Sequence, residues 1–277
     1  MGTSASSTGP GAGVSFDPPW LDDIDIPNHQ KPNEINDNPK QNESDKETDM
    51  PKWVAPKARF GSSRRSLGEY VRSGNKDYAY KALGRYSKTG MGGARNVARR
   101  MRVSTSVASN FFKTLHALKE DESFELGHVL TELQSSGANA AQIIDVIIKH
   151  VCPDGGSLDE VSCRDSGTAA LSVFMELNPD TDICNLNDDQ IWTLTSMFLS
   201  NEIFSRIQMD IGQVLEKQNV PYATVVTRLN DIRDYIQSEI ASQLNNIRET
   251  AHQQVDMNKL FQDVIKNTFE VFEVRNE

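Results

Sequence analysis

Several features that mark common protein classes are missing from this 277-residue sequence. Its cysteines, Cys152, Cys163 and Cys184, are odd in number and match no zinc or CxxC spacing, so reduced thiols are expected. No run of 18 apolar residues offers a transmembrane helix, and the N-terminus lacks the basic and apolar regions of a secretory signal. These absences predict a cytoplasmic protein without a membrane partner.

Signatures of catalysis are also missing. Residues 90–95, GMGGAR, are glycine-rich like a phosphate-binding loop, but they lack the GxxxxGK[ST] pattern and follow no predicted strand. The histidines at positions 29, 116, 128, 150 and 252 form neither an HExxH motif nor a pair spaced by four residues. We therefore expect a protein that is not an enzyme and that binds no cofactor or metal itself.

Apolar residues are scarce and charge is unevenly distributed. Hydrophobic residues make up 37% of the chain, which suggests that part of it buries nothing. The net charge is −7 over residues 17–50, +11 over 57–102 and −15 over 103–277. This pattern predicts three parts: a flexible N-terminal tail and acidic linker (1–56), a basic Gly/Arg-rich helical segment (57–102), and an acidic all-α helical domain (103–277).

The tail combines small polar residues with two apolar islands. The first island contains Phe16, Pro18, Pro19 and Trp20, and the second contains Trp53. They are either stray aromatics in an unstructured tail or linear motifs that dock in a partner's groove. Removal of Met1 would also expose the unhindered amine of Gly2, and part of such an α-amine is neutral near pH 7.5.

Two similar units, residues 66–74 and 82–90, share a Leu-Gly-x-Tyr core within the basic segment. Their apolar spacing favours short helices. We expect these helices to have N-caps at Ser66 and Asn75 and C-caps at Gly74 and Gly90.

The cations and aromatics of this segment allow three interpretations. They could track phosphates and stack bases, dock on an acidic protein, or pack against the acidic domain of the same chain. No named nucleic-acid motif is present, and the pI of 5.1 disfavours a DNA-binding protein. The candidate partner-binding residues are Arg59, Phe60, Arg64, Arg65, Tyr70, Arg72, Arg85, Tyr86, Arg95, Arg99, Arg100 and Arg102.

Beyond residue 103 the helical period dominates. Asn139 opens one helix, the pairs Ser157/Glu160 and Asn187/Gln190 form capping boxes for two more, and Pro221 begins another. A final amphipathic helix is predicted over 257–272. Since no segment reads as a strand, the predicted fold class is all-α, a helical bundle with a long disordered N-terminal arm.

The tail sequence MGTSASSTGPGAGV and two glycine-rich blocks, ARFGSSRRSLGEYVRSG (58–74) and ALGRYSKTGMGGARNVARRM (82–101), resemble the QatB family. This family belongs to the bacterial four-gene Qat anti-phage system. The resemblance implies three neighbours: a P-loop ATPase (QatA), a QueC-like protein (QatC) similar to 7-cyano-7-deazaguanine synthases, and a TatD-like nuclease (QatD).

The neighbours suggest a role for the tail. Synthases of the QueC type activate a carboxylated 7-deazaguanine with ATP, and ammonia attacks the acyl adenylate. The resemblance implies that this chain binds QatC and that the Gly2 amine replaces ammonia, with ATP and the 7-deazaguanine precursor held by the partner. The alternatives are an assembly adaptor without covalent modification and a nucleic-acid sensor acting through residues 57–102.

Overall fold

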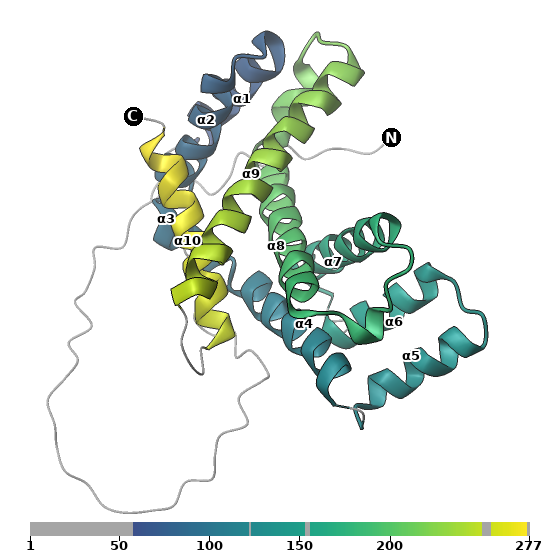
Figure 1. Ribbon diagram of the computed structural model, residues 1–277. Helices are drawn as coiled ribbons and strands as arrows, with labels where there is room; N and C mark the ends of the chain where they lie inside the picture. Colours follow the sequence, from purple (N-terminus) through teal and green to yellow (C-terminus); the bar gives the residue numbers. More distant parts are fainter. Residues whose placement is uncertain (1–57, 122, 153–155, 251–255, 276–277) are drawn as a thin grey trace, which may run out of the picture.

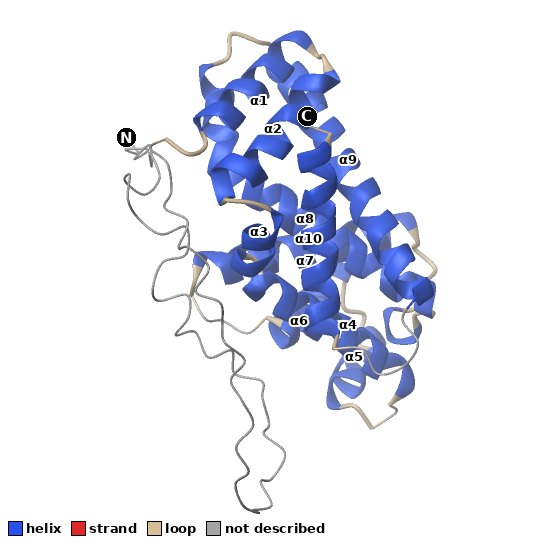
Figure 2. Ribbon diagram, turned by 90° about the vertical axis from the view of Figure 1, so that its left-hand side faces the viewer, coloured by secondary structure: helices blue, strands red, loops and turns tan. Residues whose placement is uncertain are grey.

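The computed structural model describes residues 58–121, 123–152, 156–250 and 256–275, and over these ranges it contains helices but no strand (Figure 2). The all-α prediction is therefore confirmed. The α-helices are α1 (Gly61–Ser73), α2 (Lys76–Arg85), α3 (Ala94–Arg100), α4 (Arg102–Glu120), α5 (Glu125–Ser135), α6 (Ala140–Val151), α7 (Leu158–Leu177), α8 (Asp188–Ile211), α9 (Tyr222–Thr250) and α10 (Met257–Val274). A π-helical turn, Tyr86–Met91, follows α2, and 3₁₀ turns occur at Ile183–Asn185 and Gly212–Lys217. The predicted N-terminal arm lies outside the described residues.

Local capping chemistry sets the starts of several helices. The side chains of Asn139, Ser157 and Asn187 each accept a hydrogen bond from the backbone N–H three residues later, in reciprocal capping boxes. Asn75 caps α2, and Gly74 ends α1 with a left-handed φ of 72°. These predicted boundaries are confirmed, because each depends only on neighbouring residues.

Two other predicted caps were wrong. Ser66 lies inside α1, because that helix already begins at Gly61. Gly90 lies inside the π-helical turn, and Gly92 takes the left-handed conformation instead, with φ of 79°. The reason at Gly90 is tertiary: a Cβ there would lie 2.5 Å from the ring of Phe60. The glycine is needed for close packing and not for a turn.

Helix α8 is the centre of the molecule (Figure 1). It packs against α4, α7 and α9, and it buries apolar side chains around most of its circumference, including Leu194, Phe198, Ile203 and Ile207. Helices α8, α9 and α10 run in alternating directions, with α9 packed against both of the others. A helix buried on several sides has no clean amphipathic stripe, since neighbours cover each face in turn.

The basic segment shares this core. Helices α2 and α3 pack against α10, and α1 contacts α9. The ring of Tyr86 lies 5.9 Å from that of Phe269 on α10, so aromatic contacts join residues from both sides of the charge boundary near position 102.

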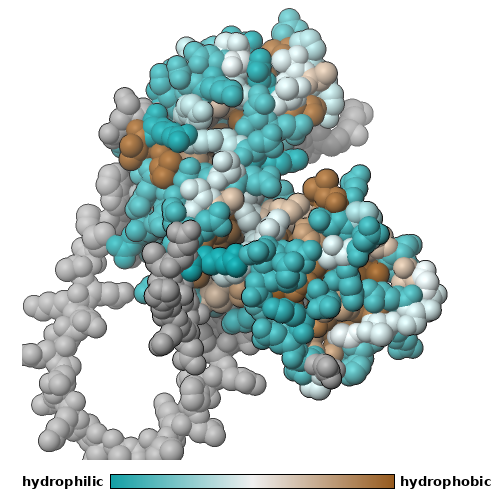
Figure 3. Space-filling model, viewed as in Figure 1, coloured by the Kyte–Doolittle hydropathy of each residue, from teal (hydrophilic) through white to brown (hydrophobic). Residues whose placement is uncertain are grey.

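The surface is mainly polar. On the face seen in Figure 3, hydrophilic side chains predominate and apolar ones lie in separate small patches. Among the described residues, the most exposed large apolar side chains are Tyr222, Leu158, Leu177 and Val274. No helix in the described ranges is long and apolar enough to cross a bilayer.

Candidate functional site

The candidate residues of the N-terminal tail lie outside the described part of the chain. The roles assigned to them by sequence therefore stay predictions. These residues are Gly2, Phe16, Pro18, Pro19, Trp20 and Trp53.

Four of the candidate residues in the basic segment are enclosed within this chain. Arg59, Phe60, Tyr70 and Tyr86 expose between 0% and 6% of their surface. The rings of Phe60 and Tyr86 are stacked with centroids 5.5 Å apart, and the Arg59 guanidinium lies 4.7 Å from the Phe60 centroid. The three aromatic rings are already packed inside this chain. A partner could contact them only if they left these positions in the fold.

Asp210 near the end of α8 is one polar anchor of the basic segment. The Tyr86 hydroxyl donates to its carboxylate at 2.9 Å, and the Arg64 guanidinium donates to its backbone carbonyl at 2.7 Å. Burial, reinforced by the Asp210 charge, holds the pKa of Tyr86 well above its ordinary value. Tyr86 is therefore a neutral hydrogen-bond donor at physiological pH.

A second anchor joins α1 to α9. The Tyr70 hydroxyl donates to Asp231 at 2.9 Å, and burial followed by this hydrogen bond raises the pKa of Tyr70 to about 12. Arg228 lies over the Tyr70 ring at 5.8 Å and pairs with Asp231 at 3.7 Å. A Cβ at Gly74 would lie 2.2 Å from the Arg228 guanidinium, so only glycine lets this arginine approach. For Tyr70, Tyr86 and Arg64, these contacts match the interpretation in which the basic segment packs against the acidic domain.

The other candidate cations lie closer to solvent. Arg65, Arg72, Arg95 and Arg99 are exposed, and Arg85, Arg100 and Arg102 are half-buried. Arg72 pairs with Glu69, and Arg85 donates to the Ser66 hydroxyl at 2.8 Å. Within the described residues, Nε and Nη2 of Arg102 are enclosed without a hydrogen-bond partner. The exposed positions of these cations are compatible with contact to an anionic partner, and their role in binding stays a prediction.

A groove between α8 and α9 was not anticipated from sequence. Its volume is about 300 Å³. Its apolar part is formed by Trp192, Met197, Ala241 and Leu244, and its polar part by Asp189, Thr193, Ser196, Gln237, Asn245 and Arg248. With six polar and four apolar lining residues, the groove is more polar than a typical small-molecule site.

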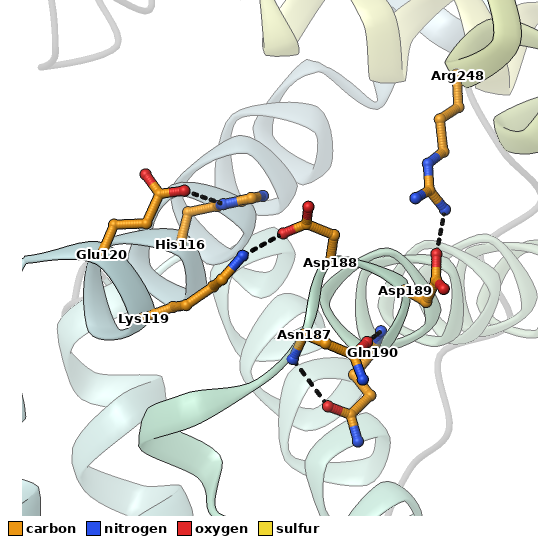
Figure 4. A network of polar contacts seen from close by, with 8 residues as sticks. All are labelled: His116, Lys119, Glu120, Asn187, Asp188, Asp189, Gln190 and Arg248. Carbon is orange, nitrogen blue, oxygen red and sulfur yellow. Dashed lines mark hydrogen bonds and ion pairs between the residues drawn. The ribbon is translucent and has the colours of Figure 1, made fainter.

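An exposed ion pair lies at one end of this groove (Figure 4). Arg248 reaches from α9 and pairs with Asp189 of α8 at 2.7 Å, and its guanidinium lies 6.0 Å from the Trp192 centroid. The Trp192 ring in turn packs at 4.6 Å against Phe112 of α4. The neighbouring Asp188 pairs with Lys119 of α4 at 2.7 Å instead. The capping box holds both aspartates in the first turn of α8, where adjacent side chains point to different sides.

Sequence reasoning also missed a buried carboxylate. Glu202 of α8 is fully buried and accepts hydrogen bonds from Ser104 of α4 at 3.0 Å and from Ser162 and Ser166 of α7 at 2.8 and 3.1 Å. Burial raises the pKa of Glu202, although the three hydroxyls oppose that shift. Its three partners come from two helices, so the cluster ties α4 and α7 to α8. In the described ranges, no group of three His, Cys, Asp or Glu residues is arranged to hold a metal ion.

Comparison with known families decides the context of this fold. The family model described as Qat anti-phage system associated protein QatB matches residues 92–272, which is more than half of the chain. The chain belongs to the QatB family. It is therefore a component of a Qat anti-phage defence system. The QatB match includes the residues of the α8–α9 groove and of the Glu202 cluster, and it does not include residues 1–91. No curated protein and no solved structure matches the chain.

Proposed function

We propose that this QatB-family chain binds the QueC-like QatC protein of its system and presents the Gly2 amine for conjugation to a 7-deazaguanine. The observation that carries the proposal is the QatB family match, combined with an N-terminal sequence of small residues that begins Met-Gly. Here the chain is a substrate and scaffold, and the ATP and base sites lie in the partner.

The length of chain before the folded body suits this role. Fifty-seven residues precede Ala58, the first described residue. At about 3.3 Å per residue, their contour reaches up to about 190 Å. The first 13 residues contain four glycines and no side chain larger than methionine, so little hinders their passage through a narrow channel.

The conjugation reaction needs only ATP, the carboxylated deazaguanine and the Gly2 amine. In the partner, the carboxylate of the deazaguanine attacks the α-phosphorus of ATP, which forms an acyl adenylate and releases pyrophosphate. The neutral Gly2 nitrogen then attacks the acyl carbon, the bond to AMP breaks, and the nitrogen loses a proton. The product is an amide, heavier than the unmodified chain by the acid less one water.

Exposed cations of the basic segment offer the docking surface. Arg65, Arg72 and Arg95 are exposed, whereas the tyrosines around which the segment folds are buried. A partner with an acidic face would be steered to these guanidinium groups. Replacing Arg65 and Arg95 together by Glu is therefore expected to weaken QatC capture without unfolding the chain. Reversal of the buried Arg59 would unfold it instead.

The test is mass spectrometry of the intact protein and its N-terminal peptide, purified with QatC and with a QatC variant inactive at its ATP site. We expect a mass gain on residue 2 only with active QatC. Gly2→Leu, which retains Met1, should abolish the gain at that residue, and Gly9→Leu serves as the matched control. An unmodified Gly2 in a system that still protects cells against phage rejects conjugation and favours a non-covalent adaptor.

The same Arg65/Arg95 variant separates a nucleic-acid sensor from a protein adaptor. A sensor would bind DNA with an affinity that falls steeply with salt, and the reversal would reduce that slope. Unchanged QatC capture together with lost DNA binding would favour the sensor.

A further inference from the structure

We propose that the groove between α8 and α9 binds a planar base of the guanine type. Trp192 forms part of the groove, and the Arg248 guanidinium lies 6.0 Å from its ring centroid. An indole ring and a planar guanidinium are the two side-chain groups that stack best on heteroaromatic rings. The volume of about 300 Å³ has room for a bicyclic base and the first atoms attached to it.

The hydrogen-bonding groups of Asp189 and Arg248, which line the groove with Trp192, would select the base. The side chain of Asp189 is 81% exposed, and its Oδ1 accepts a hydrogen bond from Nη1 of Arg248 at 2.7 Å. A carboxylate accepts two parallel hydrogen bonds. Guanine presents such a donor pair, N1–H and the 2-amino group, on one edge. Adenine presents the acceptor N1 on the same edge, which would face the carboxylate lone pairs.

Arg248 completes the match. The guanidinium carries five N–H donors, and its pair with Asp189 uses Nη1. The remaining donors suit the O6 carbonyl, which lies next to N1–H on the guanine ring. A 7-deazaguanine keeps N1–H, the 2-amino group and O6, so it satisfies the same contacts. Gln237 and Asn245, which precede Arg248 on α9 and also line the groove, offer carboxamides to the group that extends from the base.

One source of such a base is the chain itself, an extension that rests on the proposed function. A deazaguanine amide on Gly2 would be tethered to the body that carries the groove. Tethering raises the effective concentration to the order of a millimolar, so even weak intrinsic affinity would fill the site. Free guanine nucleosides or nucleotides are the other source, and their binding does not depend on Gly2.

The experiment uses the full unmodified chain, purified without QatC. Tryptophans occur at positions 20, 53 and 192, so Trp20→Phe and Trp53→Phe leave Trp192 as the single reporter. Fluorescence is titrated with 7-deazaguanosine, guanosine and adenosine. We expect saturable quenching by the two guanine-type nucleosides and at least about ten-fold weaker binding of adenosine, since adenosine would lose the hydrogen bonds to the charged Asp189 carboxylate.

Two variants test the assigned contacts. Asp189→Asn replaces one acceptor oxygen by a donor and should weaken guanosine binding at least about ten-fold. Asp188→Asn is the matched control, because Asp188 pairs with Lys119, and binding should be unchanged. Absence of saturable quenching, equal binding of adenosine, or unchanged binding by Asp189→Asn would overturn the proposal. Arg248→Gln, checked by circular dichroism, gives a second variant with the same expected loss.

The second arm addresses the tethered source. If conjugation occurs, the modified chain should show Trp192 already quenched, and Asp189→Asn should restore its fluorescence. A modified chain with an unquenched Trp192 would overturn occupancy by the tethered base, even if free nucleosides bind. Failure of the mass-spectrometric test would reject the conjugation and leave the nucleoside titration unaffected.

Discussion

Tyr86→Phe is the sharpest test of how the basic segment is held on the body of the molecule. The change removes one hydroxyl and leaves the ring, so the stacking with Phe60 at 5.5 Å and the contact with Phe269 at 5.9 Å are retained. What is lost is the 2.9 Å hydrogen bond to the Asp210 carboxylate. The measured effect therefore reports one polar contact between the basic segment and α8.

The magnitude follows from the burial of the two partners. A hydrogen bond to a charged group contributes about 1.5–3 kcal/mol to folding stability. Tyr86 is fully buried, but Asp210 is only half-buried, so water can partly replace the lost donor. We expect the free energy of unfolding to fall by about 1.5–2 kcal/mol, in the lower half of that range.

Urea unfolding followed by circular dichroism measures this loss. With a denaturant slope of about 2–3 kcal/mol/M for a body of this size, the midpoint Cm should decrease by about 0.5–1 M. Tyr222→Phe, the same chemical change at a mostly exposed tyrosine, should alter the unfolding free energy by less than about 0.5 kcal/mol.

Hydrogen exchange provides the matching local measurement. Amides of α1 and α2 should exchange faster in Tyr86→Phe, because their anchor on α8 is weakened. An unchanged Cm, or a loss equal to that of Tyr222→Phe, would refute the inference that Asp210 anchors this segment.

Three further predictions concern packing and titration. Gly90→Ala should lower the free energy of unfolding by about 1–3 kcal/mol, because the added Cβ would lie 2.5 Å from the Phe60 ring. The control Gly127→Ala, whose Cβ would have its nearest neighbour at 3.8 Å, should be neutral or stabilising. Equal urea midpoints for the two variants would contradict this packing argument. Burial raises the pKa of Glu202, so the folded state binds its proton more tightly, and the stability that this provides is present at low pH and lost as pH rises through the folded pKa. Wild type should thus gain stability relative to Glu202→Gln as pH falls from 7 towards about 4.5, and a pH-independent difference between the two urea midpoints would show that the carboxyl does not titrate differently on folding. The pKa of Tyr70 is raised to about 12, so the wild-type protein should lose stability between about pH 10 and 12. In thermal melts at alkaline pH, Tyr70→Phe should lose less stability over this range. Melting temperatures that fall in parallel for the two proteins would refute the raised pKa.

Short-range chemistry explains which parts of the fold were predictable. The capping boxes at Ser157 and Asn187 and the C-cap at Gly74 need only residues within one turn, so the sequence determines them. The absence of alternating apolar patterns likewise predicts the all-α class confirmed over the described residues. The segregation of charge along the chain is also a property of the sequence, and it indicated that the basic segment needs an acidic partner.

Tertiary structure decided which side chains of the basic segment contact the acidic helices of the same chain. In sequence, the thirteen cations of residues 57–102 leave three interpretations open, a nucleic acid, a protein partner or the chain's own acidic helices, because a charge pattern carries no information about distance. Only folding brings Tyr86 to Asp210 across 124 residues and Tyr70 to Asp231 across 161. Folding also buries Arg59 and leaves Arg65 and Arg95 exposed.

The groove and the buried carboxylate have the same origin. Asp189 and Trp192 belong to α8 and Arg248 to α9, and the sequence places both helices without fixing which of their faces meet. Glu202 similarly reads as one polar residue within a long helix until α4 and α7 supply its three serines. The sequence by itself determined the all-α class, the caps at Asn75, Gly74, Asn139, Ser157 and Asn187, and the family resemblance, since these depend on local order. Side chains far apart in the chain form a site only when packing sets the distances between helices. The tertiary structure alone decided those distances.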